Sequence, residues 1–157
     1  MDPLVIILRL VHVVAGAIWV GMATFATYYL QPAIQETGPD GGKVMAAIQR
    51  RGVMTVMPIL AVATLISGLW LYLRAAGGQH AEFARSGPGL AFGIGGLAAI
   101  VAWLIGMFVM RPAMMKAATT TGAEAQNLRA RASGAGKAVT HLLFLAVAAM
   151  AVARYIV

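Results

Sequence analysis

Four long apolar runs, separated by shorter polar segments, dominate the sequence. They cover approximately residues 4–30, 52–73, 89–110 and 138–156. A helix needs about 20 predominantly apolar residues to cross the roughly 30 Å hydrocarbon core of a bilayer, and each run is close to that length. The pattern predicts an all-α fold, in which residues 1–157 form one transmembrane domain. We expect an integral membrane four-helix bundle whose helices run alternately up and down.

The composition supports a membrane environment and narrows the classes of function. Hydrophobic residues make up 61% of the chain and charged residues only 11%, against about 25% in soluble domains. The net charge of +7 comes from basic residues in the connecting segments, which indicates contact with anionic lipid headgroups. No nucleic-acid partner is expected. Cysteine is absent, which excludes disulfides, iron–sulfur clusters and thiolate metal sites.

The basic residues also predict the orientation of the bundle. One side of the membrane holds eight of them: Lys43, Arg50, Arg51, Arg111, Lys116, Arg129, Arg131 and Lys137. The other side holds four: Arg9, Arg74, Arg85 and Arg154. The positive-inside rule then predicts a multi-pass protein of the bacterial cytoplasmic (inner) membrane with both termini outside. Residues 123–132 have a helix-forming composition and are expected to form a short amphipathic helix on the cytoplasmic surface.

The first and third runs end in similar sequences. Leu30-Gln31-Pro32-Ala33 closes the first run, and Met110-Arg111-Pro112-Ala113 closes the third. Two hairpins of the same sense would be related by a pseudo-twofold axis along the membrane normal. The similarity indicates a weak internal duplication.

A histidine lies within the first apolar run, where an ionisable side chain is costly and suggests function. His12, Gly16 and Trp19 follow an i, i+4, i+7 spacing and share one helix face. An imidazole ligand, a glycine that leaves room for a macrocycle and an aromatic wall suit haem b. The alternative is a structural histidine that is hydrogen bonded to a carbonyl of a neighbouring helix.

A six-coordinate haem needs a second axial ligand, for which the chain offers His141 or a methionine. In an up-down bundle the first and fourth helices are antiparallel, so the two histidines enter from opposite sides. At 1.5 Å per residue, their depths differ by roughly 20 Å if the first helix begins at Leu10. The difference falls to roughly 10 Å if it begins at Leu4. A shared site is therefore the less favoured arrangement, and a residue of a partner subunit could complete the site instead.

Copper handling is an alternative function. Thioethers are ligands that Cu(I) prefers, and two methionine pairs, Met54 with Met57 and Met107 with Met110, lie three residues apart. In this alternative, His12 and the paired methionines guide the ion. A divalent metal at the outer surface would need a cluster of Asp2, His12, His80 and Glu82, although His80 is more simply a solvated loop residue.

Other functions find less support in the sequence. The five acidic residues all lie outside the apolar runs, whereas proton-coupled transporters commonly carry an intramembrane carboxylate. No glycine-rich phosphate loop or nucleophile elbow is present, and the sequence does not decide whether the protein is an enzyme. A third possibility is a non-catalytic accessory subunit of a larger respiratory or other membrane complex.

The segment Leu8-Arg9-Leu10-Val11-His12-Val13-Val14-Ala15-Gly16-Ala17-Ile18-Trp19-Val20-Gly21 resembles the first helix of a group of small bacterial membrane proteins. This group includes the copper-resistance-D-type proteins and the HemJ-type protoporphyrinogen oxidases. Ser67-Gly68-Leu69-Trp70 is similar to the same group. The resemblance implies a four-helix membrane core, haem or copper as cofactor, and His12 as the family's histidine. HemJ-type proteins also keep a basic residue within the third span, whereas Arg111 and Lys116 here follow the predicted span.

Overall fold

The computed structural model describes residues 2–156, and within them it is helical with no β-strand. The elements are α1 (Pro3–Phe25), η1 (Ala26–Leu30), α2 (Gln31–Glu36), η2 (Gly38–Asp40), α3 (Gly41–Arg50), α4 (Val53–Ala76), α5 (His80–Arg85), α6 (Gly87–Ile105), η3 (Gly106–Met110), α7 (Arg111–Thr119), α8 (Gly122–Val152) and η4 (Ala153–Tyr155). The all-α prediction is confirmed.

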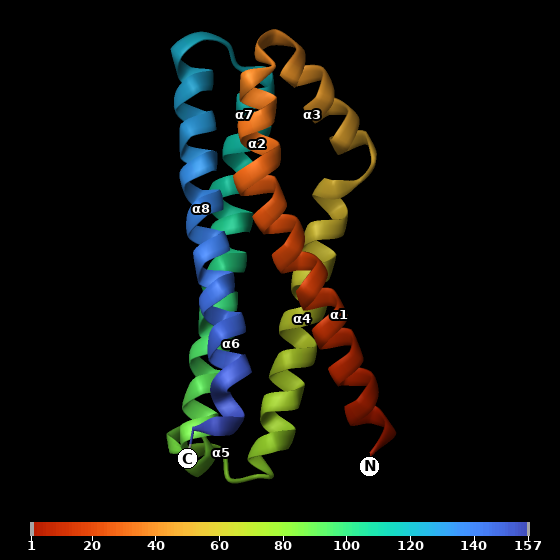
Figure 1. The fold of residues 1–157 in the computed structure, drawn as a ribbon, viewed down its shortest axis with the longest axis vertical. Coiled ribbons are helices and arrows are strands. Elements are labelled where there is room, and N and C mark those ends of the chain that lie inside the picture. Colours follow the sequence, from red (N-terminus) through yellow and green to blue (C-terminus); the bar gives the residue numbers. More distant parts are fainter. Residues whose placement is uncertain (1, 157) are drawn as a thin grey trace.

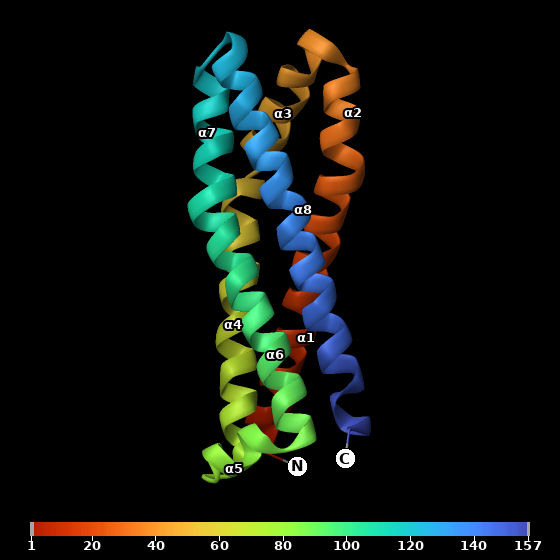
Figure 2. The ribbon, with the colours of Figure 1, turned by 90° about the vertical axis from the view of Figure 1, so that its left-hand side faces the viewer.

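These elements join into four long helical rods: Pro3–Glu36, Val53–Ala76, Gly87–Thr119 and Gly122–Tyr155. All four are long and apolar enough to cross a membrane, so the chain is a multi-pass membrane protein. The rods run alternately up and down, with both termini and α5 at one end of the bundle and α2, α3 and α7 at the other (Figures 1 and 2).

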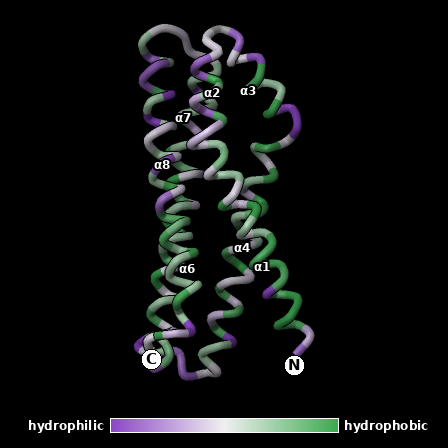
Figure 3. Tube along the Cα trace, in the orientation of Figure 1, coloured by the Kyte–Doolittle hydropathy of each residue, from purple (hydrophilic) through white to green (hydrophobic). Residues whose placement is uncertain are grey.

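Three of the rods are much longer than the predicted spans. They contain 33 or 34 residues, or about 50 Å of helix, and so exceed the hydrocarbon thickness of about 30 Å. The excess lies at the end distant from the termini, where the hydropathy is mixed (Figure 3). Residues 123–132 are helical as predicted, but they continue without a break into the last span as part of α8 rather than forming a separate surface helix. The separate short helix on this side is α3, which the sequence analysis did not anticipate.

The similar sequences that close the first and third apolar runs also have similar local structures. A π-helical segment of five residues, η1 or η3, immediately precedes the similar Gln31-Pro32 and Arg111-Pro112 sequences. A proline inside a helix lacks the N–H that bonds the preceding turn, and its ring crowds the carbonyl four residues earlier. A π segment at this point accommodates the extra backbone and keeps the rod continuous. The two rods are therefore alike in local structure as well as in sequence.

The helices pack closely because their contact faces carry small side chains. The buried core contains Ala61, Ala98, Ala99, Ala102 and Ala146 around Trp19, Val139 and Leu143. Rods with small residues at their interface approach closely, as is usual in membrane bundles. The large aliphatic side chains of α1, α4 and α6 face outward, and the lipid bilayer is the medium that covers such a surface.

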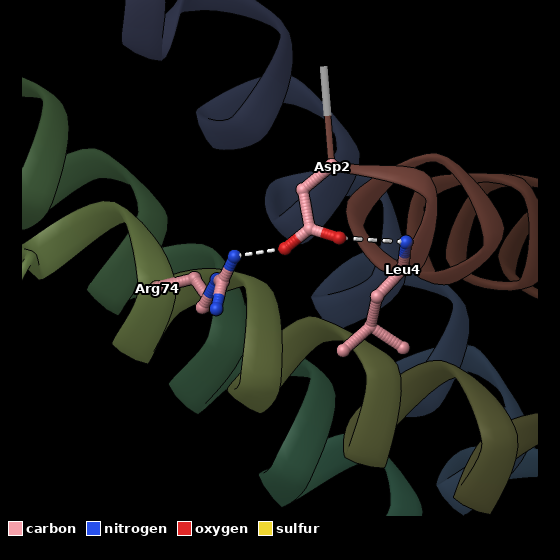
Figure 4. Close-up of polar contacts among 3 residues, drawn as sticks. All are labelled: Asp2, Leu4 and Arg74. Atoms are coloured by element: carbon pink, nitrogen blue, oxygen red, sulfur yellow. Dashed lines mark hydrogen bonds and ion pairs between the residues drawn. The ribbon is translucent and has the colours of Figure 1, made fainter.

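One polar contact joins two rods at the end that carries the N-terminus. The Asp2 carboxylate accepts a hydrogen bond from the Leu4 backbone N–H at 3.0 Å and so caps the start of α1. Its other oxygen pairs with the guanidinium of Arg74 near the end of α4 (Figure 4). The cap and the ion pair together fix the first turn of α1 against α4.

Candidate functional site

His12 lies at the interface between α1 and α4. Its Nδ1 atom is 2.9 Å from the Thr64 carbonyl oxygen and 3.4 Å from Ser67 Oγ. A carbonyl oxygen only accepts hydrogen bonds. Nδ1 therefore carries the proton and donates the hydrogen bond to the backbone carbonyl of Thr64. In the neutral ring, Nε2 then holds the lone pair. The sequence analysis considered such a hydrogen bond to a carbonyl of a neighbouring helix as the alternative to a role of His12 as a haem ligand.

Gly68 of α4 makes room for the imidazole. A methyl group built at this position would lie 2.6 Å from His12 Cε1 and 3.0 Å from Nδ1, which is closer than van der Waals contact allows. Only a glycine accommodates the ring here. Ser67 and Gly68, which carry part of the family resemblance, are therefore direct neighbours of His12 in the structure.

The other two residues of the predicted haem face have different surroundings. A methyl group on Gly16 would lie 3.4 Å from Thr64 Cγ2, so the space above this glycine belongs to α4. Trp19 is buried in the core with 5% of its surface exposed, and it also lines the cavity described below. Gly16 therefore lies at the contact of α1 with α4, and its proposed role of clearing space for a macrocycle stays a prediction.

His141 does not lie near His12. Its Nε2 is 2.9 Å from the hydroxyl oxygen of Tyr28, and both side chains are exposed. Tyr28 follows His12 by sixteen residues on the same rod, or roughly 24 Å along the helix. The first helix begins at Pro3, yet the gap is not reduced to 10 Å, because His141 lies beside Tyr28 rather than near the level of His12. One iron cannot join these histidines.

A cavity of about 160 Å³, partly open to the surroundings, lies between the rods in the other half of the bundle. Side chains of both π segments, η1 and η3, line it together with Pro58 of α4 and residues of α3 and α8. Six of the lining residues are methionines: Met45, Met54, Met57, Met107, Met110 and Met114. We call this space the methionine cavity. The structure thus brings the two methionine pairs of the sequence analysis together. π segments are frequent at functional sites, and two of them border this one cavity.

Arg111 is the charged residue in the wall of the methionine cavity. Its Nη1 lies 3.9 Å from Met107 Sδ, and no carboxylate of residues 2–156 forms an ion pair with it. The sequence analysis placed Arg111 after the third span, but α6, η3 and α7 form one continuous rod that includes it. Arg111 thus belongs to the same helix as the third span, but it lies about 36 Å from the start of that helix, beyond a hydrocarbon core of about 30 Å.

Trp103 contributes a second donor group. Its indole Nε1 is buried and has no hydrogen-bond acceptor among the described residues, and its side chain lines the methionine cavity. Buried N–H groups are nearly always paired. The residues that line the cavity thus include Arg111, whose only protein partner among the described residues is the weak acceptor Met107 Sδ, and Trp103, whose buried Nε1 has no acceptor among them.

The metal cluster that the sequence analysis considered as the less favoured role of His80 does not form. Within residues 2–156, no three His, Asp or Glu side chains come close enough to share a metal ion. Asp2 is instead engaged by Arg74, and His80 is an exposed residue at the start of α5.

Sequence reasoning identified His12 but missed its partners, and it did not foresee that Arg111 lines a cavity. Thr64 and Gly68 belong to a different helix, so their contact with His12 depends on how the two helices are rotated. The proline after Arg111 suggested an end to the span, whereas the π segment before it lets the helix continue. No protein-family model, curated protein or solved structure shows a significant match to the chain.

Proposed function

We propose that this protein binds haem b in the membrane and serves electron transfer or haem-linked redox chemistry, with His12 as an axial ligand. One observation supports this assignment most directly. The Nδ1–H of His12 donates to the Thr64 carbonyl, which leaves Nε2 as the nitrogen available to iron. Histidines that bind metals commonly donate their other N–H in this way, because the hydrogen bond fixes the tautomer and the ring orientation.

The residues around His12 fit one axial position. Thr64 and Ser67 hold the Nδ1 side of the ring, and Gly68 provides the space that the ring occupies. His141 is too distant to be the second ligand. The haem is thus five-coordinate, or its second ligand is a methionine or a residue of a partner subunit. Haem iron, when bound, supplies one-electron chemistry whose potential depends on the axial ligand and the polarity of the pocket.

We further propose that the protein resides in the cytoplasmic membrane of a bacterium with both termini outside. The end of the bundle with α2, α3 and α7 carries most of the basic residues, and the opposite end carries the termini and α5 (Figure 1). The positive-inside rule assigns the more basic end to the cytoplasm.

An optical spectrum tests the haem assignment. The protein purified after expression with added haem should show a Soret band. His12→Ala should abolish it, while His141→Ala, the matched control on another helix, should retain it. Added imidazole should restore the band in His12→Gly, because the free ligand can occupy the space left by the side chain. Absence of the band in the wild-type protein, or its survival in His12→Ala, would contradict the proposal.

Copper handling is the second candidate, because the structure brings the methionine pairs of α4 and η3 into one cavity. Thioether sulfurs are suitable ligands for Cu(I). The positive charge of Arg111 in the same wall opposes a cation there, which makes this candidate weaker than haem binding. Metal analysis of purified wild-type protein and of a Met57→Leu, Met107→Leu variant would distinguish them, since copper bound in the cavity requires these sulfurs. The exposed apolar faces of the rods are explained by lipid and do not by themselves favour an accessory role.

A further inference from the structure

The methionine cavity is built for a ligand whose polar end accepts hydrogen bonds. Arg111 is half-buried in its wall and pairs with no carboxylate of residues 2–156. Trp103 adds a buried N–H that lacks an acceptor among the same residues. Neither group can accept a hydrogen bond. A ligand with an acceptor group would give Arg111 a stronger partner than the thioether of Met107, and a negative charge on it would compensate the guanidinium.

The rest of the wall requires an apolar body. Methionine side chains from α3, α4, η3 and α7 supply a flexible, polarizable surface that adapts to irregular shapes. The volume of about 160 Å³ is close to that of an engineered cavity that accepts benzene. It accommodates part of a hydrocarbon chain. This site is also distinct from His12, which does not line the cavity.

We propose that the methionine cavity binds a single-chain anionic amphiphile, such as a fatty acid, with its carboxylate at Arg111 and its chain among the methionines. Arg111 follows the first residue of its rod by 24 residues, or about 36 Å of helix. That length exceeds the hydrocarbon core, so Arg111 reaches the level of the lipid headgroups. The carboxylate of the bound amphiphile would therefore stay at the headgroup level, where it also lies when the amphiphile is dissolved in the bilayer.

Tryptophan fluorescence measures this binding directly. Trp70 is exposed to the extent of 51% and is removed as Trp70→Phe, which leaves Trp19 and Trp103, both in the cavity wall. The protein is reconstituted in phosphatidylcholine vesicles at alkaline pH and titrated with 9,10-dibromostearate, whose bromines quench nearby indoles. Saturable quenching is expected. The methyl ester of the same acid, which lacks the charge, should quench weakly and without saturation.

Substitutions assign the head group to its site. Arg111→Gln should weaken the affinity for dibromostearate by at least about tenfold, since a hydrogen bond to a charged group is lost. Arg111→Lys retains the charge and should remain within a few-fold of the wild type. Arg129→Gln, a change of the same kind at an exposed site of α8, should have no effect. Circular dichroism confirms that each variant is folded.

Three results would overturn the proposal. One is equal quenching by the acid and its ester, which would show that only the apolar chain is recognised. Another is an unchanged affinity in folded Arg111→Gln. The third is full competition by inorganic phosphate at the same concentration as the acid, which would show a small-anion site without a chain. His12→Ala should bind the acid normally, so failure of the haem assignment would leave this test unaffected.

Discussion

The imidazole of His12 occupies the space that any side chain at position 68 would need. A methyl group on Gly68 would lie 2.6 Å from His12 Cε1, although the two residues belong to different helices. The close packing of α1 on α4 at this level therefore depends on the pair rather than on either residue alone.

Gly68→Ala should destabilise the protein by about 1–3 kcal/mol, the usual cost of overpacking a closely packed interface. The same change in a His12→Ala background should cost much less, because the ring that it meets is absent. Unfolding of all four proteins of this cycle in mixed detergent micelles measures the coupling. An equal cost of Gly68→Ala in both backgrounds would show that the contact does not determine the packing of α1 on α4.

The sequence was sufficient to predict the four rods because a bilayer demands about 20 apolar residues for each crossing, and nothing else in the chain resembles that pattern. It also identified His12 as an exceptional residue, since polarity within an apolar run is visible without a structure. The contact with Thr64 was foreseeable only as an alternative, because the neighbouring helix and its rotation are set by packing.

The π segments and the extent of the rods were not predictable in the same way. The residues of η3 are apolar on all sides, so they would suit an α-helix or a π-helix in lipid equally well. The sequence therefore contains no hydrophobic periodicity that distinguishes the two geometries. Pro112 indicated an end to the third span, and the polar residues of 123–132 indicated a surface helix. Both segments continue their rods beyond the thickness of the bilayer, so Arg111 belongs to the same helix as the third span and still lies after the bilayer crossing.

Two neighbouring glycines in α6 should respond differently to the same substitution. A methyl group on Gly95 would lie 3.0 Å from the Ala146 carbonyl oxygen and 3.1 Å from Met150 Cγ, whereas one on Gly96 would meet nothing within 4 Å. Gly96→Ala should be neutral or stabilising by up to about 1 kcal/mol, since alanine favours the helix. Gly95→Ala should be destabilising, because the rigid backbone of α8 must move. The unfolding free energies of the two variants provide the measurement, and a similar result for both would contradict the close approach of α6 and α8.

Asp2 should stabilise the protein mainly as a helix cap. Its carboxylate accepts the Leu4 N–H, and it also pairs with Arg74 (Figure 4). Asparagine caps helices as well as aspartate does, so Asp2→Asn should lose only the ion pair, which is half-exposed and contributes less than about 1 kcal/mol. Asp2→Ala should lose about 1 kcal/mol more.

The ion-pair part of the Asp2 contact should also be sensitive to salt. The difference between wild type and Asp2→Asn should shrink as the salt concentration rises, while the difference between Asp2→Asn and Asp2→Ala should stay constant. Unfolding measured at two salt concentrations separates the two contributions. If Asp2→Asn were as unstable as Asp2→Ala at high salt, the cap would not be the main contribution.

Thr140 and His141 are adjacent in the chain, but their side chains have opposite environments. Thr140 is fully buried, with its hydroxyl 3.0 Å from the Gly136 carbonyl oxygen and 3.2 Å from Thr27 Oγ1. His141 is exposed and bonds to Tyr28. Thr140→Val removes a hydroxyl from a buried network and leaves Thr27 with one partner fewer, which should cost about 1–3 kcal/mol. Tyr28→Phe removes an exposed hydroxyl and should change the unfolding free energy by less than about 1 kcal/mol, because water or lipid headgroups replace the lost bond. Unfolding curves of the two variants test this ordering, and a larger loss in Tyr28→Phe would show that the outward-facing pair, rather than the buried threonines, holds α8 against η1.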